Sequence, residues 1–286
     1  MKAKEPTTFD QQVNILKERG LLIPEDKTCE NFLHSVNYYR LTAYLLPFKQ
    51  ENNTYKTGTT FEELHQIYEF DRKLSHLIFS IIEEIELFLR TQFAYYHAHR
   101  YGALGYLDPE NFNDMHNPDD FSDRIDHVLY EHRFSPVVIH HQKNYDGILP
   151  IWAIIEFFSI GMLSKFYSDM ILKDKKDIAR QLFNTSYSCL DSWLRCLSDL
   201  RNRCAHYSRL YYWKFTAIPK SYPNSFFQRN RRLFDQLLVL QHLYTNNFKW
   251  HTSFMVPLQT IMEEYKDHIY LEHIGFPQEW YSLLNK

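Results

Sequence analysis

Apolar residues recur at steps of three and four along most of the chain, which is the spacing of helices that bury one face. The longest such run begins at Thr60 and continues to Phe93, with Ile67, Leu74 and Ile78 among its apolar positions. Further helices are expected over about 8–19, 27–36, 121–143, 151–170, 186–206 and 226–246. No segment shows the two-residue alternation of a strand over a useful length. The pattern predicts an all-α fold.

Polar segments separate these helices without dividing the chain into independent domains. Residues 49–59 and 111–120 are rich in loop-forming residues, and the charged stretch 173–177 marks a turn. Pro219 and Pro223 interrupt the segment before the last long helix. With no internal repeat and no low-complexity linker, we expect a single compact helical domain. It would comprise N-terminal helices over about 8–58, a helical core over about 60–246 and a C-terminal helical extension over 247–286.

The composition excludes several classes of protein. Seven glycines in 286 residues are few, and neither GxGxxG nor GxxxxGK[ST] occurs, so nucleotide-binding folds built on those loops are excluded. No apolar run approaches the roughly 18 residues that a membrane-spanning helix needs. The four cysteines form no CxxC pair and the first residues are polar, so we expect a cytoplasmic protein.

The net charge of −3 averages over two oppositely charged regions. Residues 100–131 carry eight acids and two bases, a balance of −6. Residues 195–232 carry nine bases and one acid, a balance of +8. A local positive field of this size can hold a polyanion even on an acidic protein.

The sharpest local signal lies in LRNRCAHYSR, residues 200–209, which contains the pattern RNxxxH. Asn202 and His206 are four residues apart and share one helix face, and the long Arg201 side chain can swing toward that face. Histidine can move a proton near neutral pH, and arginine can bind phosphate oxygens and stabilise developing charge. The set suits phosphodiester cleavage without a metal ion. The alternative is a solvent-facing arginine beside a histidine that caps or packs.

The motif and several other segments resemble a known group of proteins. RNxxxH on a helix of an all-α protein resembles the HEPN superfamily of RNases. Other segments look like its Abi-like (abortive infection) branch, and they occur in the family's order from about residue 8 to 213. These segments are TTFDQQVNILKERGLLI, VNYYRLTAYLLPF, TGTTFEELHQIYEFDRKL, IEEIELFLRTQFAY and LRNRCAHYSRLYYW.

The resemblance implies a HEPN-like helical core, metal-independent endoribonuclease activity, dimerisation and a toxin-like role in phage defence. By position, the catalytic residues would be Arg201, Asn202 and His206. Glu86 and Arg90, on the helix that packs beside the catalytic helix in HEPN folds, would have a supporting role. The products would be a 2′,3′-cyclic phosphate and a 5′-hydroxyl. A toxin needs restraint, so a partner protein acting as antitoxin or a regulatory non-coding RNA is expected.

RNA is the expected substrate, because the mechanism needs a 2′-hydroxyl. The basic region and the tyrosines that follow the motif are the expected contact surface. The residues proposed to contact RNA are Arg203, Arg209, Arg229, Arg231, Arg232, Tyr211 and Tyr212. The alternative for Tyr211 and Tyr212 is a packing role. Tyrosines in a helical protein more often bury the ring in the core and leave the hydroxyl in contact with solvent.

No metal and no cofactor are expected. Cys189, Cys196 and Cys204 line one helix face and with His206 suggest a zinc site, but ligands spread over four helical turns cannot converge on one tetrahedral ion. They are better interpreted as small buried hydrophobic residues. Two other functions stay open: a non-catalytic RNA-binding or regulatory module that uses the same basic face, and a helical scaffold that binds only proteins.

Overall fold

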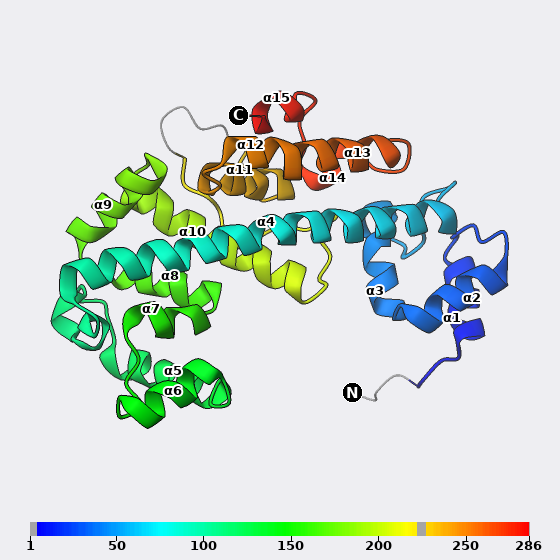
Figure 1. Cartoon of the computed structure of the whole chain (residues 1–286). Helices are drawn as coiled ribbons and strands as arrows, with labels where there is room; N and C mark the ends of the chain where they lie inside the picture. The colour runs from blue at the N-terminus through cyan, green and yellow to red at the C-terminus, as the bar shows by residue number, and fades with distance from the viewer. Residues whose placement is uncertain (1–4, 222–226, 286) are drawn as a thin grey trace.

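A helix of 41 residues, α4 (Phe61–Tyr101), runs through the molecule, and the other elements pack along it (Figure 1). The computed structural model describes residues 5–221 and 227–285, and these contain helices and no strand. Thr60 caps α4 by accepting a hydrogen bond from the Glu63 amide at 3.0 Å. The expected fold class, a single compact all-α domain, is confirmed.

The N-terminal helices lie at the beginning of α4 (Figure 1). A capping box between Thr8 and Gln11 starts the first of them. Gly20, in the left-handed region at φ +89°, follows its end. The four elements are α1 (Phe9–Glu18), α2 (Asp26–Ser35), α3 (Tyr38–Thr42) and η1 (Ala43–Phe48).

The middle of the chain gathers around the other end of α4, where α10 (Tyr187–Ala205) packs against both α4 and α8 (Figure 1). Ser186 caps α10 through the Cys189 amide. The remaining elements are η2 (Gly105–Leu107), η3 (Pro109–Asn111), α5 (Pro118–Glu131), α6 (Pro136–Asn144), α7 (Ile151–Ile154), η4 (Ile155–Phe157), α8 (Ile160–Asp169) and α9 (Leu172–Phe183).

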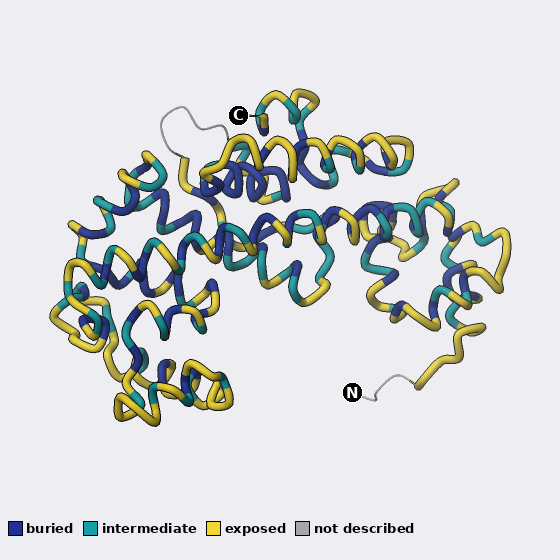
Figure 2. Tube along the Cα trace, viewed as in Figure 1, coloured by how far each residue is buried: buried dark blue, intermediate teal, exposed yellow. Residues whose placement is uncertain are grey.

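The C-terminal elements cover a further side of α4 (Figure 1). The first of them, α11 (Leu233–Leu243), is buried along almost its whole length (Figure 2), because it lies between α10, α4 and α15. The others are α12 (Asn247–Lys249), the π-helical η5 (Trp250–Met255), α13 (Val256–Glu264), α14 (Leu271–Ile274) and α15 (Trp280–Leu284). No helix in the described ranges has the length and apolar character to cross a membrane.

Two expected helices are each broken into two parts. The segment 121–143 forms α5 and α6, because the chain turns between them and restarts at Pro136, a residue suited to the first turn of a helix. The segment 151–170 is interrupted at Phe158, whose backbone is extended, and Ser159 then caps α8. The helices expected over 8–19, 27–36 and 186–206 are confirmed within two residues.

Two other expectations were wrong. The charged stretch 173–177 is helical within α9, because Asp174 is buried and pairs with Arg100 at 2.8 Å instead of facing solvent in a turn. The last long helix begins at Leu233 and not near residue 226. Arg229 and Arg231 have left-handed backbones, at φ +55° and +63°, which a right-handed helix cannot include. Residue 226 and Pro223 lie outside the described residues.

One histidine of α4 is buried without a polar partner among the described residues. The ring of His97 packs against Tyr101, Phe112 and Phe166, and neither ring nitrogen makes a hydrogen bond in the part of the chain that is described. Burial lowers the pKa of His97 from 6.5 to about 4. His97 is therefore neutral in the folded protein at all but strongly acidic pH.

This burial predicts a loss of stability in mild acid. Below about pH 6.5 the unfolded chain binds a proton at His97, whereas the folded chain does so only near pH 4. The free energy of unfolding should therefore fall as the pH falls from about 6.5 to 4, by up to about 3 kcal/mol from this group. Because Asp71 and His273 also titrate in this range, the effect of His97 is measured as a difference between proteins. Between pH 6.5 and 4, urea titrations should show the wild type and the exposed control His127→Gln losing up to about 3 kcal/mol more stability than His97→Leu. A His97→Leu variant that loses as much stability as the wild type would contradict this account.

Candidate active site at the end of helix α10

The RNxxxH motif occupies the last turn of α10. The helix ends at Ala205, and His206 is its C-cap residue, with its amide bonded to the Asn202 carbonyl at 3.0 Å. This bond places Asn202 and His206 one above the other on the same face, as the spacing predicts. Both residues are exposed, and neither side chain makes a hydrogen bond to the described residues. Their polar atoms face solvent and are free to meet a substrate.

A buried carboxylate of α4 holds the arginine of the motif. The Nε atom of Arg201 lies 3.7 Å from Oε2 of Glu86, whose side chain is only 10% exposed. Oε1 of the same carboxylate accepts a hydrogen bond from Nη2 of Arg90 at 2.5 Å. The structure thus brings together Arg201 and the two residues expected to support it.

Arg90 also connects this cluster to the break between η4 and α8. Its Nε and Nη2 atoms donate to the Phe158 carbonyl at 3.2 and 2.9 Å. Phe158 is extended and follows the last residue of η4, so its carbonyl does not accept the backbone hydrogen bond that a continuing helix would supply. Arg90 donates hydrogen bonds to both the Phe158 carbonyl and the Glu86 carboxylate. It thereby holds the carboxylate in position to contact Arg201.

The side chain of Arg201 is 30% exposed, and it makes no hydrogen bond within the described chain. Its contact with Glu86 engages the Nε edge of the guanidinium group. The terminal nitrogens are left as donors for an anion, which is the arrangement that suits a phosphate.

The chain just after the motif is anchored by a second buried carboxylate of α4. Asp71 accepts hydrogen bonds from the Leu210 amide at 3.0 Å, the Tyr211 amide at 2.7 Å and the Tyr44 hydroxyl at 2.8 Å. Burial raises the pKa of Asp71 to about 6, and these hydrogen bonds act against that rise. Asp71 thereby fixes the segment that leaves the motif against α4 and η1.

Arg203 and Arg209, both expected to contact RNA, are engaged in internal contacts. The guanidinium group of Arg203 lies 3.6 Å from the centre of the Trp213 ring and donates to the Arg209 carbonyl at 3.2 Å. Arg209 donates to the Ala43 carbonyl of η1. Burial lowers the pKa of both guanidinium groups. These two arginines brace the segment after the motif, and their guanidinium groups are engaged in contacts within the fold.

Tyr211 is not available for stacking on a base. Its side chain is 0% exposed, its hydroxyl bonds to Nδ1 of His273 at 2.8 Å, and it accepts from the Tyr270 amide at 3.1 Å. The expected RNA contact at Tyr211 is therefore corrected to a packing role, because no ring face reaches solvent. Tyr212 is half-buried, and the guanidinium group of Arg232 lies 4.4 Å from its ring centre.

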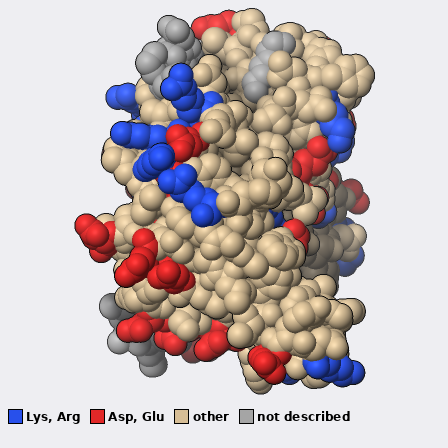
Figure 3. Space-filling model, turned by 60° about the vertical axis from the view of Figure 1, so that its left-hand side comes forward, with Lys and Arg blue, Asp and Glu red and all other residues tan. Residues whose placement is uncertain are grey.

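The remaining basic residues expected to bind RNA lie on the segment before α11. Arg229 and Arg231 are exposed, although Arg229 donates to the Ser221 hydroxyl at 3.1 Å and Arg231 to the Phe215 carbonyl at 2.8 Å. Arg232 is half-buried. Figure 3 shows a cluster of basic side chains in the upper part of one face, with most of the acidic side chains of its left half below that cluster.

The cysteines and the acidic region do not form a metal centre in the described ranges, which contain no group of three His, Cys, Asp or Glu placed to hold an ion. Cys189, Cys196 and Cys204 are buried and free, in agreement with their interpretation as small core residues. Burial raises the pKa of both Cys196 and Cys204 to about 12, so neither is a ready nucleophile.

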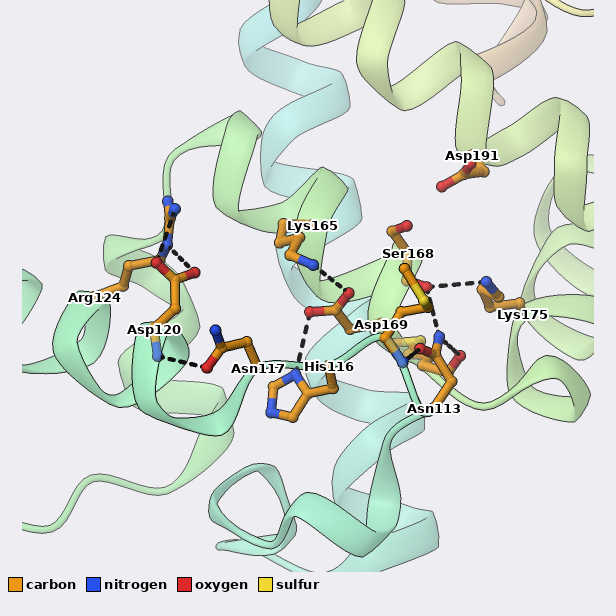
Figure 4. A network of polar contacts seen from close by, with 12 residues as sticks. Asn113, His116, Asn117, Asp120, Arg124, Lys165, Ser168, Asp169, Lys175 and Asp191 are labelled. Atoms are coloured by element: carbon orange, nitrogen blue, oxygen red, sulfur yellow. Dashed lines mark hydrogen bonds and ion pairs between the residues drawn. The ribbon is translucent and has the colours of Figure 1, made fainter.

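A second polar network, which the sequence does not reveal, joins the loop after η3 to the end of α8 (Figure 4). Asp169 accepts from Lys165 at 2.7 Å and lies 3.1 Å from Nδ1 of His116. Asn113 donates to the Ser168 and Met170 carbonyls at 2.8 and 3.0 Å. Because the His116 and Asp169 side chains are only 4% and 5% exposed, this network braces the fold and has little access to a substrate.

Asp71 is not among the residues predicted from the sequence, although the sequence contains a signal for it. Asp71 lies four residues after Ile67 and three before Leu74, inside the apolar stripe of α4. An acid at a core position of a helix indicates a buried carboxylate with dedicated donors.

Part of the chain is similar to a known protein family. A family model described as Abi-like protein matches residues 31–212, well over half of the chain. The matched region includes Asp71, the Glu86–Arg90 pair and the whole RNxxxH motif, whereas the helices from α11 onward lie outside it. No curated protein and no solved structure matches the chain.

The hydrogen bonds of Asp71 predict that Asp71→Asn is strongly destabilising. An asparagine keeps one acceptor oxygen, but its amide would face a backbone donor, so at least one buried donor loses its partner. The expected loss is about 2–3 kcal/mol in the free energy of unfolding. The stability contributed by this carboxyl falls as the pH rises from about 4 to 6, so the comparison belongs near pH 7.5, where Asp71 is ionised.

Urea denaturation of Asp71→Asn and of the exposed control Asp267→Asn measures this effect. The control should lie within about 0.5 kcal/mol of the wild type. Equal stability of the two variants would show that the Asp71 contacts do not hold the segment.

Proposed function

This chain belongs to the Abi-like protein family, and from that premise we propose that it is a metal-independent endoribonuclease of the HEPN type. Its role would be that of a toxin-like effector in abortive infection, a form of phage defence. The single observation that carries the enzymatic proposal is the geometry of the motif. Arg201 is held by a buried carboxylate with donors to spare, beside an exposed histidine and amide on the same helix end.

Each residue of the motif has a role in cleavage of RNA. His206 takes the proton of a 2′-hydroxyl, whose oxygen then attacks the adjacent phosphorus. Arg201 stabilises the charge that develops on the phosphoryl oxygens, and Asn202 orients the reacting groups. The bond to the 5′-oxygen breaks and that oxygen takes up a proton, which leaves a 2′,3′-cyclic phosphate and a 5′-hydroxyl. Glu86 and Arg90 position Arg201 without touching the substrate.

A homodimer would complete this acid–base set. One RNxxxH motif supplies one histidine, whereas in-line cleavage benefits from a second proton-transfer group. Two-fold symmetry would place two copies of the motif at one site. Restraint of such a toxin by an antitoxin protein or a non-coding RNA belongs to the same proposal.

The active-site assignment predicts that Arg201→Ala and His206→Ala each lower the rate of RNA cleavage by about 10²- to 10³-fold. Both side chains are accessible, so the variants should keep the fold, as circular dichroism can verify. Purified protein is incubated with single-stranded RNA in EDTA, and the ends of the fragments are mapped. Arg180→Ala and His127→Ala, exposed residues on α9 and α5, are matched controls that should cut like the parent. RNA that is bound but never cut by the parent would replace the enzyme with a non-catalytic RNA-binding module.

The composite site predicts that two inactive subunits can complement each other. A mixture of Arg201→Ala and His206→Ala chains should recover part of the cleavage rate, because some dimers would hold one intact copy of each group. Light scattering at micromolar concentration, with and without RNA, checks that dimers form. A strict monomer in both conditions, or a mixture as inactive as its parts, would rule out the composite site.

A further inference from the structure

A pocket of about 380 Å³ opens beside the end of the RNxxxH motif. Three segments line it: residues 35–44 of the N-terminal helices, residues 68–76 of α4, and Tyr207 with Ser208 directly after His206. Cys204 of the motif also contacts Ser75 in this part of α4. The pocket therefore lies beside the proposed active site, directly beyond the C-terminal end of the motif, and its volume suits one nucleotide better than a longer piece of RNA.

The lining of the pocket carries unused positive charge. Arg72 and His76 lie four residues apart on one face of α4, and both are exposed. Neither side chain has a hydrogen bond or ion pair within the described residues. Arg40 also lines the pocket, and it differs from these two residues because it already donates to the Tyr207 carbonyl. The acid of the lining, Asp71, is fully buried and already accepts three hydrogen bonds. A phosphate would find free donors here and no exposed carboxylate to repel it.

An aromatic ring stands at the rim of the same pocket. Tyr207 is 69% exposed, unlike the buried Tyr211 four residues later. Its backbone is in the left-handed region at φ +53°, which is uncommon for tyrosine and persists only where neighbours enforce it. The Tyr207 amide bonds to the Cys204 carbonyl at 3.1 Å, and Arg40 donates to the Tyr207 carbonyl. The ring is held outward next to His206, where a base can stack on it.

We propose that this pocket, lined by Arg40, Arg72, His76 and Tyr207, binds the nucleotide of a single-stranded RNA that neighbours the cleaved phosphodiester. Arg72 contacts a phosphate and Tyr207 stacks on the base. The inference rests on the proposed ribonuclease function and extends it. The RNA path then runs over the N-terminal helices and α4, in place of Arg203, Arg209 and Tyr211, which are engaged within the fold.

Binding is measured on the His206→Ala protein, so that the RNA is not cut. The anisotropy of a short fluorescein-labelled single-stranded RNA is titrated between about 50 and 200 mM salt. Adding Arg72→Gln should weaken binding about tenfold. It should also lower the slope of log affinity against log salt concentration by about one, which corresponds to the loss of one phosphate contact. Adding Tyr207→Ala should weaken binding about tenfold with an unchanged salt dependence, and Tyr207→Phe should restore it. Arg180→Gln on α9 is the matched control and should bind like the parent.

The outcomes separate this inference from the function on which it rests. If the His206→Ala protein binds the RNA but Arg72→Gln and Tyr207→Ala bind it equally well, the pocket is not on the RNA path and the inference is overturned, while the ribonuclease proposal stands. If the wild-type protein neither binds nor cuts RNA, the proposed function itself fails. Thermal melting of each variant confirms that lost binding is not lost folding.

Discussion

The buried carboxylate of Asp71 is where three parts of the chain meet. It receives the hydroxyl of Tyr44 from the N-terminal helices and the amides of Leu210 and Tyr211 from the segment after the motif. A carboxylate without such donors is costly inside a protein, and backbone amides without an acceptor are costly too. The Asp71 carboxylate and the two backbone amides therefore need each other as hydrogen-bond partners. Their contact fixes the end of α10 against one position of α4.

That fixed position determines what surrounds the motif. With Leu210 and Tyr211 tied down, Tyr207 and Ser208 must turn sharply between the end of α10 and Asp71, and the left-handed backbone of Tyr207 is the result. The same constraint closes one wall of the pocket next to His206. The surface near the motif is thus built from α4 and the N-terminal helices, and less from the basic region after it than the charge pattern suggests.

The sequence predicts the features that local rules decide. The apolar spacing and caps define α4 and α10, and the spacing of Asn202 and His206 puts them on one face. It does not predict the break at Phe158, because Arg90 satisfies the carbonyl exposed there from another helix. The burial of Tyr211 likewise cannot be predicted from the local sequence, because its hydrogen-bond partners His273 and Tyr270 are about 60 residues away. Contacts between distant segments decide these features, and no local pattern encodes them.

The pairing of Glu86 with two arginines explains how Arg201 can be both held and available. A buried carboxylate paired with Arg201 alone would cancel its charge, and an unpaired Arg201 would lose its orientation. Arg90 makes the short contact to Glu86, at 2.5 Å, and Arg201 the longer one, at 3.7 Å. The three groups together keep one positive charge, and the more exposed arginine, Arg201, is the one to which the proposed function assigns the substrate. A guanidinium group fixed before the substrate arrives needs no reorganisation when charge develops, which is the condition for electrostatic catalysis.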